Sequence, residues 1–226
     1  RHSEVSQASQ ERKRLGSGIV MNIPKSGLFS AFSLIVDINS FTRLVAFHDL
    51  SNISNYVHDV LIGSVSAIED CGGSVIGVMG DAIFGVLESS DVVVQSCSAI
   101  AKDVNALCEY LAGTEYEEGV PGLPSLKIGI EYGTLSAATI RSDALGTIPF
   151  CIGPATNYAA RILGAGKGNR CHVGPKAMQA GLSEYIHLDQ FLEVDGKPGE
   201  PTYRYWQLDL SDIWIEGEPE DGIRYW

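Results

Sequence analysis

The chain has 226 residues and 24.3 kDa, which suits one large domain with short extensions, and 45% of its residues are hydrophobic, enough for a core. Its formal net charge of −12 and pI near 4.7 exclude the broad basic face that sequence-independent binding of a nucleic-acid polymer needs. A site for a single nucleotide is compatible with this charge, because it needs only local positive groups.

The cysteines and the apolar runs indicate the compartment. The five cysteines show no CxxC spacing and lie mostly in apolar runs, so we expect free buried thiols in a reducing cytoplasm. No apolar run reaches membrane-spanning length, and the polar N-terminus does not read as a signal peptide.

The first half of the chain predicts a strand, a helix, a hairpin and a second helix. The strand follows a polar N-terminal arm, residues 1–28, and the second helix precedes an acidic loop, residues 113–125. The four elements are expected, from apolar periodicity and from glycine and serine boundary signals, at residues 31–38, 51–69, 73–87 and 91–111.

The second half predicts shorter elements. We expect a hairpin, a strand, a helix, a strand, a helix and a closing hairpin at residues 126–140, 150–152, 154–163, 171–173, 175–181 and 186–208. Hairpins outnumber parallel crossovers, so the predicted fold class is α+β, with helices packed on a mostly antiparallel sheet.

Two aspartates end strands that are expected to pair. Asp37 follows the apolar run 32–36, and Asp81 lies at the tip of the hairpin. If these strands are neighbours, both carboxylates meet at one edge of one sheet. An aspartate after a strand is most often a turn former or helix cap. Two such carboxylates with nothing basic beside them, however, suit a hard divalent cation, Mg²⁺ or Mn²⁺.

A third group of candidates lies further along the chain. Asn157 and Arg161 are four residues apart on a predicted helix and therefore share a face. The rest of that face is expected to be small, with Ala155, Ala159 and Ala160. A guanidinium can bind phosphate in a bidentate manner, and Lys197, in a Gly-Lys-Pro-Gly turn, could hold an outer phosphate. A surface salt bridge and a solvated turn are the alternatives for Arg161 and Lys197.

These residue types suit metal-assisted attack on a phosphoryl centre. One metal would lower the pKa of an attacking hydroxyl and a second would bridge the leaving phosphates. Arg161 would balance the charge that builds on the phosphorus-bound oxygens. The glycine-rich segment 164–168 lacks the frame of a Walker loop and is interpreted as an ordinary loop.

Five motifs, in order, resemble those of the class III nucleotide cyclase domain, the fold of adenylate and guanylate cyclases. Residues 36–42 are similar to its D-I-x-x-F-T metal motif and residues 72–82 to its hairpin ending in G-D-A. The other three motifs, R-I-G-I-H-x-G, G-x-x-V-N-x-A-A-R and a closing L-K-G-K…Y hairpin, resemble residues 127–133, 153–161 and 194–203. The resemblance covers about residues 29–208, leaves 209–226 as an acidic tail, and implies a ferredoxin-like cyclase fold.

The resemblance implies how one chain would hold metals and phosphates. Asp37, Asp81 and the backbone carbonyl of Ile38 would bind two divalent cations, and main-chain N–H groups near Phe41 and Thr42 would bind the outer phosphates.

The remaining roles involve a second chain. By the same resemblance, Asn157 and Arg161 would act from a partner subunit on the ribose and the reacting phosphate, while Lys197 would hold the triphosphate. A head-to-tail homodimer with shared active sites follows. The 3′-hydroxyl of a nucleoside triphosphate would attack the α-phosphorus and give a 3′,5′-cyclic nucleotide and pyrophosphate.

The positions that read the base depart from the family. Gly77 stands where the family has Lys or Glu, and Phe150 where it has a polar residue; a shift of one residue would bring Cys151 there. Without hydrogen-bonding partners the pocket would not select a purine in the usual way. In this respect the chain resembles the stand-alone pyrimidine cyclases of bacterial phage defence. We therefore expect a pyrimidine cyclase making cyclic UMP or cyclic CMP, with adenylate or guanylate cyclase activity or an inactive nucleotide-binding module as alternatives.

Overall fold

The computed structural model describes residues 21–47, 50–113, 125–144, 146–166, 168–186 and 190–209. Its strands are β1 (Gly27–Ile38), β2 (Ser74–Met79), β3 (Ala82–Leu87), β4 (Leu126–Ser142), β5 (Gly146–Ile152), β6 (Arg170–Val173), β7 (Leu192–Val194) and β8 (Tyr203–Asp209). Its helices are α2 (Phe41–Phe47), α3 (Leu50–Asp70), α4 (Ser90–Gly113), α5 (Pro154–Ala165), α6 (Pro175–Gln179) and the 3-10 turn η1 (Leu182–Glu184). Most of the predicted arm, the acidic loop and the tail lie outside the described residues.

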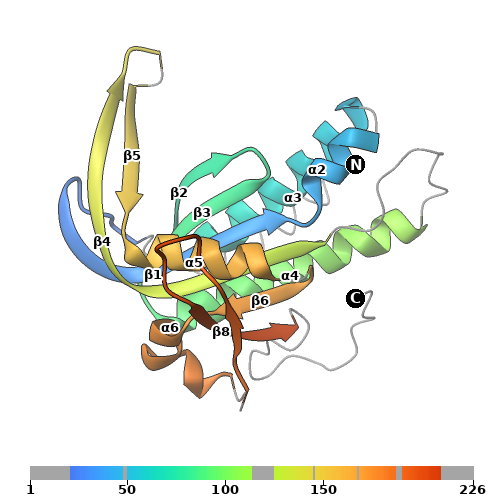
Figure 1. The fold of residues 1–226 in the computed structure, drawn as a ribbon. Coiled ribbons are helices and arrows are strands. Elements are labelled where there is room, and N and C mark those ends of the chain that lie inside the picture. Colours follow the sequence, from blue (N-terminus) through green and yellow to red (C-terminus); the bar gives the residue numbers. More distant parts are fainter. Residues whose placement is uncertain are drawn as a thin grey trace.

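The strands form one sheet with helices on both faces. The strand order is β2-β3-β1-β4-β6-β8-β7, with β5 paired to β4. Every pairing is antiparallel except that of β4 with β6. Helices α3 and α4 cover one face, where the main core lies, and α5 covers the other (Figure 1). The predicted α+β class with a mostly antiparallel sheet is confirmed.

The hairpin predicted at residues 126–140 is wrong. β4 is a single strand that runs through Gly133, and the chain turns back only after Ser142. Gly133 allows close approach of a helix, because a Cβ there would lie 3.4 Å from the Cβ of Ala155 on α5. The returning strand β5 is consequently longer than the expected 150–152, and β4 and β5 extend together as an arm beyond the body of the molecule (Figure 1).

Three other features of the structure differ from the prediction. Helix α2 was not predicted at all, and strand β7 begins only at Leu192. The end of the predicted N-terminal arm is attached to the domain, since Met21 N donates to Gly72 O at 3.0 Å and Ser74 Oγ donates to Met21 O at 2.7 Å. Within the described residues, no helix combines the length and apolar character needed to cross a bilayer.

Gly129 sets how closely α5 lies on the sheet. A Cβ at this position would stand 2.4 Å from the carbonyl oxygen of Ala159. Because this oxygen belongs to the backbone, no side-chain rotation can relieve the clash. We expect Gly129→Ala to lower the free energy of unfolding by about 2–3 kcal/mol. The control is Gly164→Ala in the last turn of α5, where a Cβ meets open space and should stabilise by up to about 1 kcal/mol. Urea denaturation of both variants tests this, and equal effects would contradict it.

His172 on β6 makes stability depend on pH. Its side chain is fully buried, and its Nδ1 lies 3.1 Å from the carbonyl oxygen of Ile128. Burial lowers its pKa from 6.5 to about 4; the positive charges of Lys127 and Arg170 act in the same direction, against the hydrogen bond to Ile128. The imidazole therefore stays neutral in the fold at pH values where the unfolded chain binds a proton.

Stability is consequently lost as pH falls from about 6.5 towards 4. Between pH 7 and pH 5 this group should remove about 2 kcal/mol of the free energy of unfolding. The difference between the wild type and His172→Gln, followed by urea denaturation across this range, isolates the contribution from that of the carboxylates. Parallel curves for the two proteins would show that His172 does not titrate differently in the fold.

Candidate active site

The structure brings Asp37 and Asp81 together. β1 and β3 pair with Asp37 opposite Ala82, so the two-residue turn Gly80-Asp81 places its aspartate beside the end of β1. Gly80 has φ +64°, which suits the first central position of such a turn. Ile38 N donates to Asp81 O at 3.3 Å. Burial raises the pKa of Asp81, and the charge of the Asp37 carboxylate and a hydrogen bond to it act in the same direction.

The expectation that nothing basic lies beside this pair is wrong. Lys127 is opposite Asp37 in the β1–β4 register, and its Nζ lies 3.2 Å from Asp37 Oδ2. The sequence motifs around the two aspartates contain no basic residue, so only long-range strand pairing reveals this contact. Two carboxylates and one ammonium leave a formal charge of −1 on the three groups. Among the described residues, no group of three or more His, Cys, Asp or Glu side chains gathers as a metal cluster.

The start of α2 follows directly from the strand that carries Asp37. Ile38 is buried, so only its backbone can take part in a site. Phe41 packs against the core and Thr42 is exposed, and Arg43 N donates to Ser40 O at 2.9 Å. Phe41 and Thr42 occupy the first turn of a helix, where backbone N–H groups have no partner within the helix.

Asn157 and Arg161 lie on the outer side of α5. Asn157 and Ala160 are exposed, whereas Arg161 is half-buried and its Nη2 lies 2.5 Å from Glu200 Oε1. The expected small face is partly wrong, because Ala155 and Ala159 are buried against the sheet. The helix must present small residues there to approach Gly129 and Gly133 of β4, so these alanines serve packing and leave no space for a ligand.

Lys197 is exposed in the loop between β7 and β8. Its turn is closed by Glu200 N, which donates to Lys197 O at 2.8 Å. Glu200 therefore links this loop to Arg161. Within the described part of the chain, no hydrogen bond or ion pair joins Arg161 or Lys197 to the Asp37–Asp81 pair.

The three base-reading candidates fall on different faces of the sheet. Side chains alternate along a strand, so Ile35 and Asp37 of β1 lie on the same face of the sheet, the face covered by α5. Gly77 lies on this face too, because it pairs with Phe84, which in turn pairs with Ile35. Cys151 pairs with Ala137 on this same face, but Phe150 pairs with Ala138 and faces the opposite way. A Cβ at Gly77 would meet open space. The register thus favours Cys151 over Phe150 as a neighbour of the Asp37 face.

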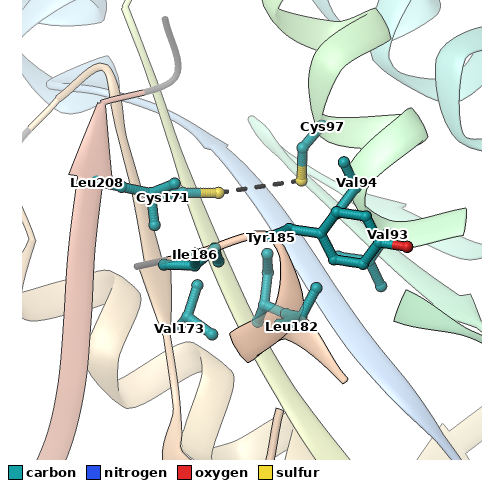
Figure 2. Close-up of a pocket in the computed structure, with 10 residues that line it drawn as sticks. Val93, Val94, Cys97, Cys171, Val173, Leu182, Tyr185, Ile186 and Leu208 are labelled. Atoms are coloured by element: carbon teal, nitrogen blue, oxygen red, sulfur yellow. Dashed lines mark hydrogen bonds between the residues drawn. The ribbon is translucent and has the colours of Figure 1, made fainter. Parts of the chain in front are cut away.

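The cavity drawn in Figure 2 lies elsewhere. It measures about 20 Å³, room for one water molecule, and is lined mainly by apolar residues of α4, β6 and the segment around η1. Cys97 and Cys171 face one another beside it with their sulfur atoms 3.9 Å apart. Cys97, Cys151 and Cys171 are buried free thiols, as expected; Cys71 is only partly buried, and the side chain of Cys108 lies outside the described residues.

Several residues of the candidate region were not singled out from the sequence. Lys127 and Glu200 bind site candidates through contacts between distant segments. Glu131, which stands where the family motif has His, is buried and accepts hydrogen bonds from the backbone N–H groups of Ala177 and Tyr132 at 2.7 and 2.9 Å. The sequence shows that Glu131 replaces the histidine of the motif. It does not show that the carboxylate of Glu131 accepts a hydrogen bond from Ala177 on α6.

Comparison with known proteins identifies the fold. No protein-family profile matches the chain. An adenylate cyclase of Anabaena cylindrica is 29% identical over 144 residues, which are 62% of this chain but only 28% of that cyclase. The guanylyl cyclase Cya2 superposes with a TM-score of 0.69 at 16% identity, covering 81% of this chain and 93% of its own. The dimeric guanylyl cyclase domain of the RhoGC fusion protein from the aquatic fungus Blastocladiella emersonii superposes with a TM-score of 0.60 at 16% identity, covering 81% and 98%. The chain therefore has the fold of class III nucleotide cyclase catalytic domains.

Proposed function

We propose that this chain is a nucleotide cyclase, which converts a nucleoside triphosphate to a 3′,5′-cyclic nucleotide and pyrophosphate. The observation that carries the proposal is the Asp37–Asp81 pair, placed at the ends of neighbouring strands within a class III cyclase fold. In the reaction the ribose 3′-oxygen forms a bond to the α-phosphorus while the bond from that phosphorus to the leaving pyrophosphate breaks.

The residues fit two hard divalent cations, Mg²⁺ or Mn²⁺. Asp37, Asp81 and the backbone carbonyl of Ile38 offer only oxygen donors, the ligands these ions prefer. When bound, the cations would lower the pKa of the attacking hydroxyl and stabilise the leaving phosphates. The net negative charge that remains beside Lys127 favours their binding.

The other candidates are assigned to the triphosphate and the ribose. The first backbone N–H groups of α2, at Phe41 and Thr42, would bind the outer phosphates, and the exposed Lys197 would add a positive charge to them. Arg161 would stabilise charge on the reacting phosphate, and Asn157 would orient the ribose.

We propose that the active sites are shared within a head-to-tail homodimer. Glu200 links Arg161 to the Lys197 turn, and among the described residues no hydrogen bond or ion pair joins these two groups to the Asp37–Asp81 pair, so a second chain would complete the site. The β4–β5 arm and the adjoining start of β1 carry a suitable contact surface, because the register puts four exposed apolar side chains on one face, namely Leu28, Ile140, Phe150 and Ile152. This apolar stripe gives Phe150 a place in subunit contact instead of in the base pocket.

Ile140→Glu should separate the subunits and remove activity. Ile140 is 52% exposed in the single chain, so a charge there disturbs the fold little but opposes burial in an interface. The control is Ile62→Glu on α3, which is 50% exposed and lies away from the stripe. Light scattering should show a monomer only for Ile140→Glu. A dimer with full activity in that variant would contradict the proposed interface.

The base that the cyclase uses is tested by product analysis. The named relatives are adenylate and guanylyl cyclases, which favours a purine triphosphate over the pyrimidine expected from the sequence. A pyrimidine substrate is the second candidate, because Gly77 offers no side chain to a base. The wild type should be incubated with Mn²⁺ and each of ATP, GTP, UTP and CTP, and the products identified by mass spectrometry. Absence of every cyclic product would reject cyclase function.

A further inference from the structure

Glu200 contacts both the proposed phosphate-binding arginine and the loop of Lys197. Its Oε1 accepts a hydrogen bond from Arg161 Nη2 at 2.5 Å. Its Oε2 accepts from Lys197 N at 3.2 Å and from Tyr203 Oη at 3.3 Å. A single carboxylate thus joins α5, the turn between β7 and β8, and the start of β8.

The contact leaves part of the Arg161 guanidinium free. Its Nε is buried and has no hydrogen-bond partner, while Nη2 is held by Glu200. A guanidinium presents donors in a rigid fork, so fixing one nitrogen fixes the direction of the others. An unpartnered buried donor costs stability unless an acceptor arrives, and a phosphate oxygen is such an acceptor.

The loop that carries Lys197 also has hydrogen bonds of its own. Glu200 N donates to Lys197 O at 2.8 Å, and Thr202 Oγ1 donates to Asp195 Oδ1 at 3.2 Å. Tyr158 Oη ties α5 to the backbone of Arg204, further along β8, at 2.9 and 3.0 Å. The tip of the loop is instead joined to α5 through Glu200 and Arg161.

We propose that Glu200 is a positioning residue that holds Arg161 and the Lys197 turn in one arrangement, ready for the triphosphate. This inference rests on the proposed cyclase function and deepens it. Glu200 does not touch the reacting atoms; it acts through the direction of the Arg161 fork and the place of the Lys197 backbone. The opposite role, a carboxylate that competes with the triphosphate for Arg161, predicts the opposite change in rate.

Kinetics of Glu200→Ala and Glu200→Gln with Mn²⁺ and the wild type's preferred triphosphate test the proposal. We expect kcat to fall about 10–100-fold in Glu200→Ala, the size of effect that misplaced binding groups produce. Glu200→Gln, which keeps an acceptor for Arg161, should lose less. The matched control is Glu193→Ala, which breaks the neighbouring ion pair with Arg204, 2.8 Å apart on the same hairpin, and should leave kcat within about twofold.

A double-mutant cycle separates positioning from general damage. In the Arg161→Ala background, Glu200→Ala should lower kcat by a smaller factor than in the wild type, because only the Lys197 turn is left for it to position. Additive losses, an unchanged kcat or a raised kcat in Glu200→Ala would each overturn the proposal. Absence of product from the wild type would overturn the cyclase function itself, whereas product from the wild type with an unchanged Glu200→Ala overturns only the role of Glu200.

Discussion

Asp81→Asn is expected to abolish formation of cyclic nucleotide, with a loss of about 10³-fold or more in kcat, while the fold is kept. Asparagine matches the size of the aspartate and is tolerated in turns, and the hydrogen bond from Ile38 N uses only the backbone of residue 81. The variant removes one of the two charges that would hold the cations. Asp37→Asn should act alike and also release Lys127 from its ion pair.

The role of Asp81 in binding metal can also be tested by measuring the melting temperature with and without Mn²⁺. Mn²⁺ should raise the melting temperature of the wild type but not of Asp81→Asn, because ligands stabilise only the state they bind. Asp59→Asn is a matched control, since its side chain is 62% exposed on α3, away from the site. Full activity in Asp81→Asn, or an unchanged rise in melting temperature, would remove the metal assignment.

Arg161→Ala is expected to lower kcat by about 10²–10³-fold, the usual loss when a group that stabilises developing charge is removed. The decisive result comes from mixing this variant with Asp81→Asn. Random assembly of equal amounts makes about half of the dimers mixed, and each mixed dimer has one intact site of two. About a quarter of wild-type activity should therefore return.

Rescue on mixing requires that the aspartates and the arginine come from different chains. If the mixture stays as inactive as its parts while the subunits exchange, each chain holds its own complete site, and the head-to-tail arrangement is wrong.

The aspartate pair could be predicted from the sequence because its signals are local. A glycine before Asp81 marks a tight turn, and an apolar run leads into Asp37, so only the pairing of two strands had to be assumed. Lys127 and Glu200 could not be predicted in this way. Each approaches its partner through the register or the packing of segments far apart in the chain, which no local pattern reports.

Glycine and alanine gave the wrong predictions for a common reason. The hairpin predicted at residues 126–140 contains Gly133, and the small face expected beside Arg161 contains Ala155 and Ala159, but all three residues allow α5 to lie against β4. A small residue in a sequence indicates that another group approaches it closely, but it does not show whether that group is a ligand or a neighbouring helix or strand. The faces of Phe150 and Cys151 were likewise open until the β4–β5 register was known, because a shift of one residue reverses every side chain.

The most direct measurement is the anomalous scattering of a crystal grown with Mn²⁺ and a non-hydrolysable nucleoside triphosphate analogue. Manganese should appear between the carboxylates of Asp37 and Asp81, beside the phosphates of the analogue, with Arg161 of a second chain facing the α-phosphate. An analogue bound elsewhere, with no manganese at these two aspartates, would contradict the account.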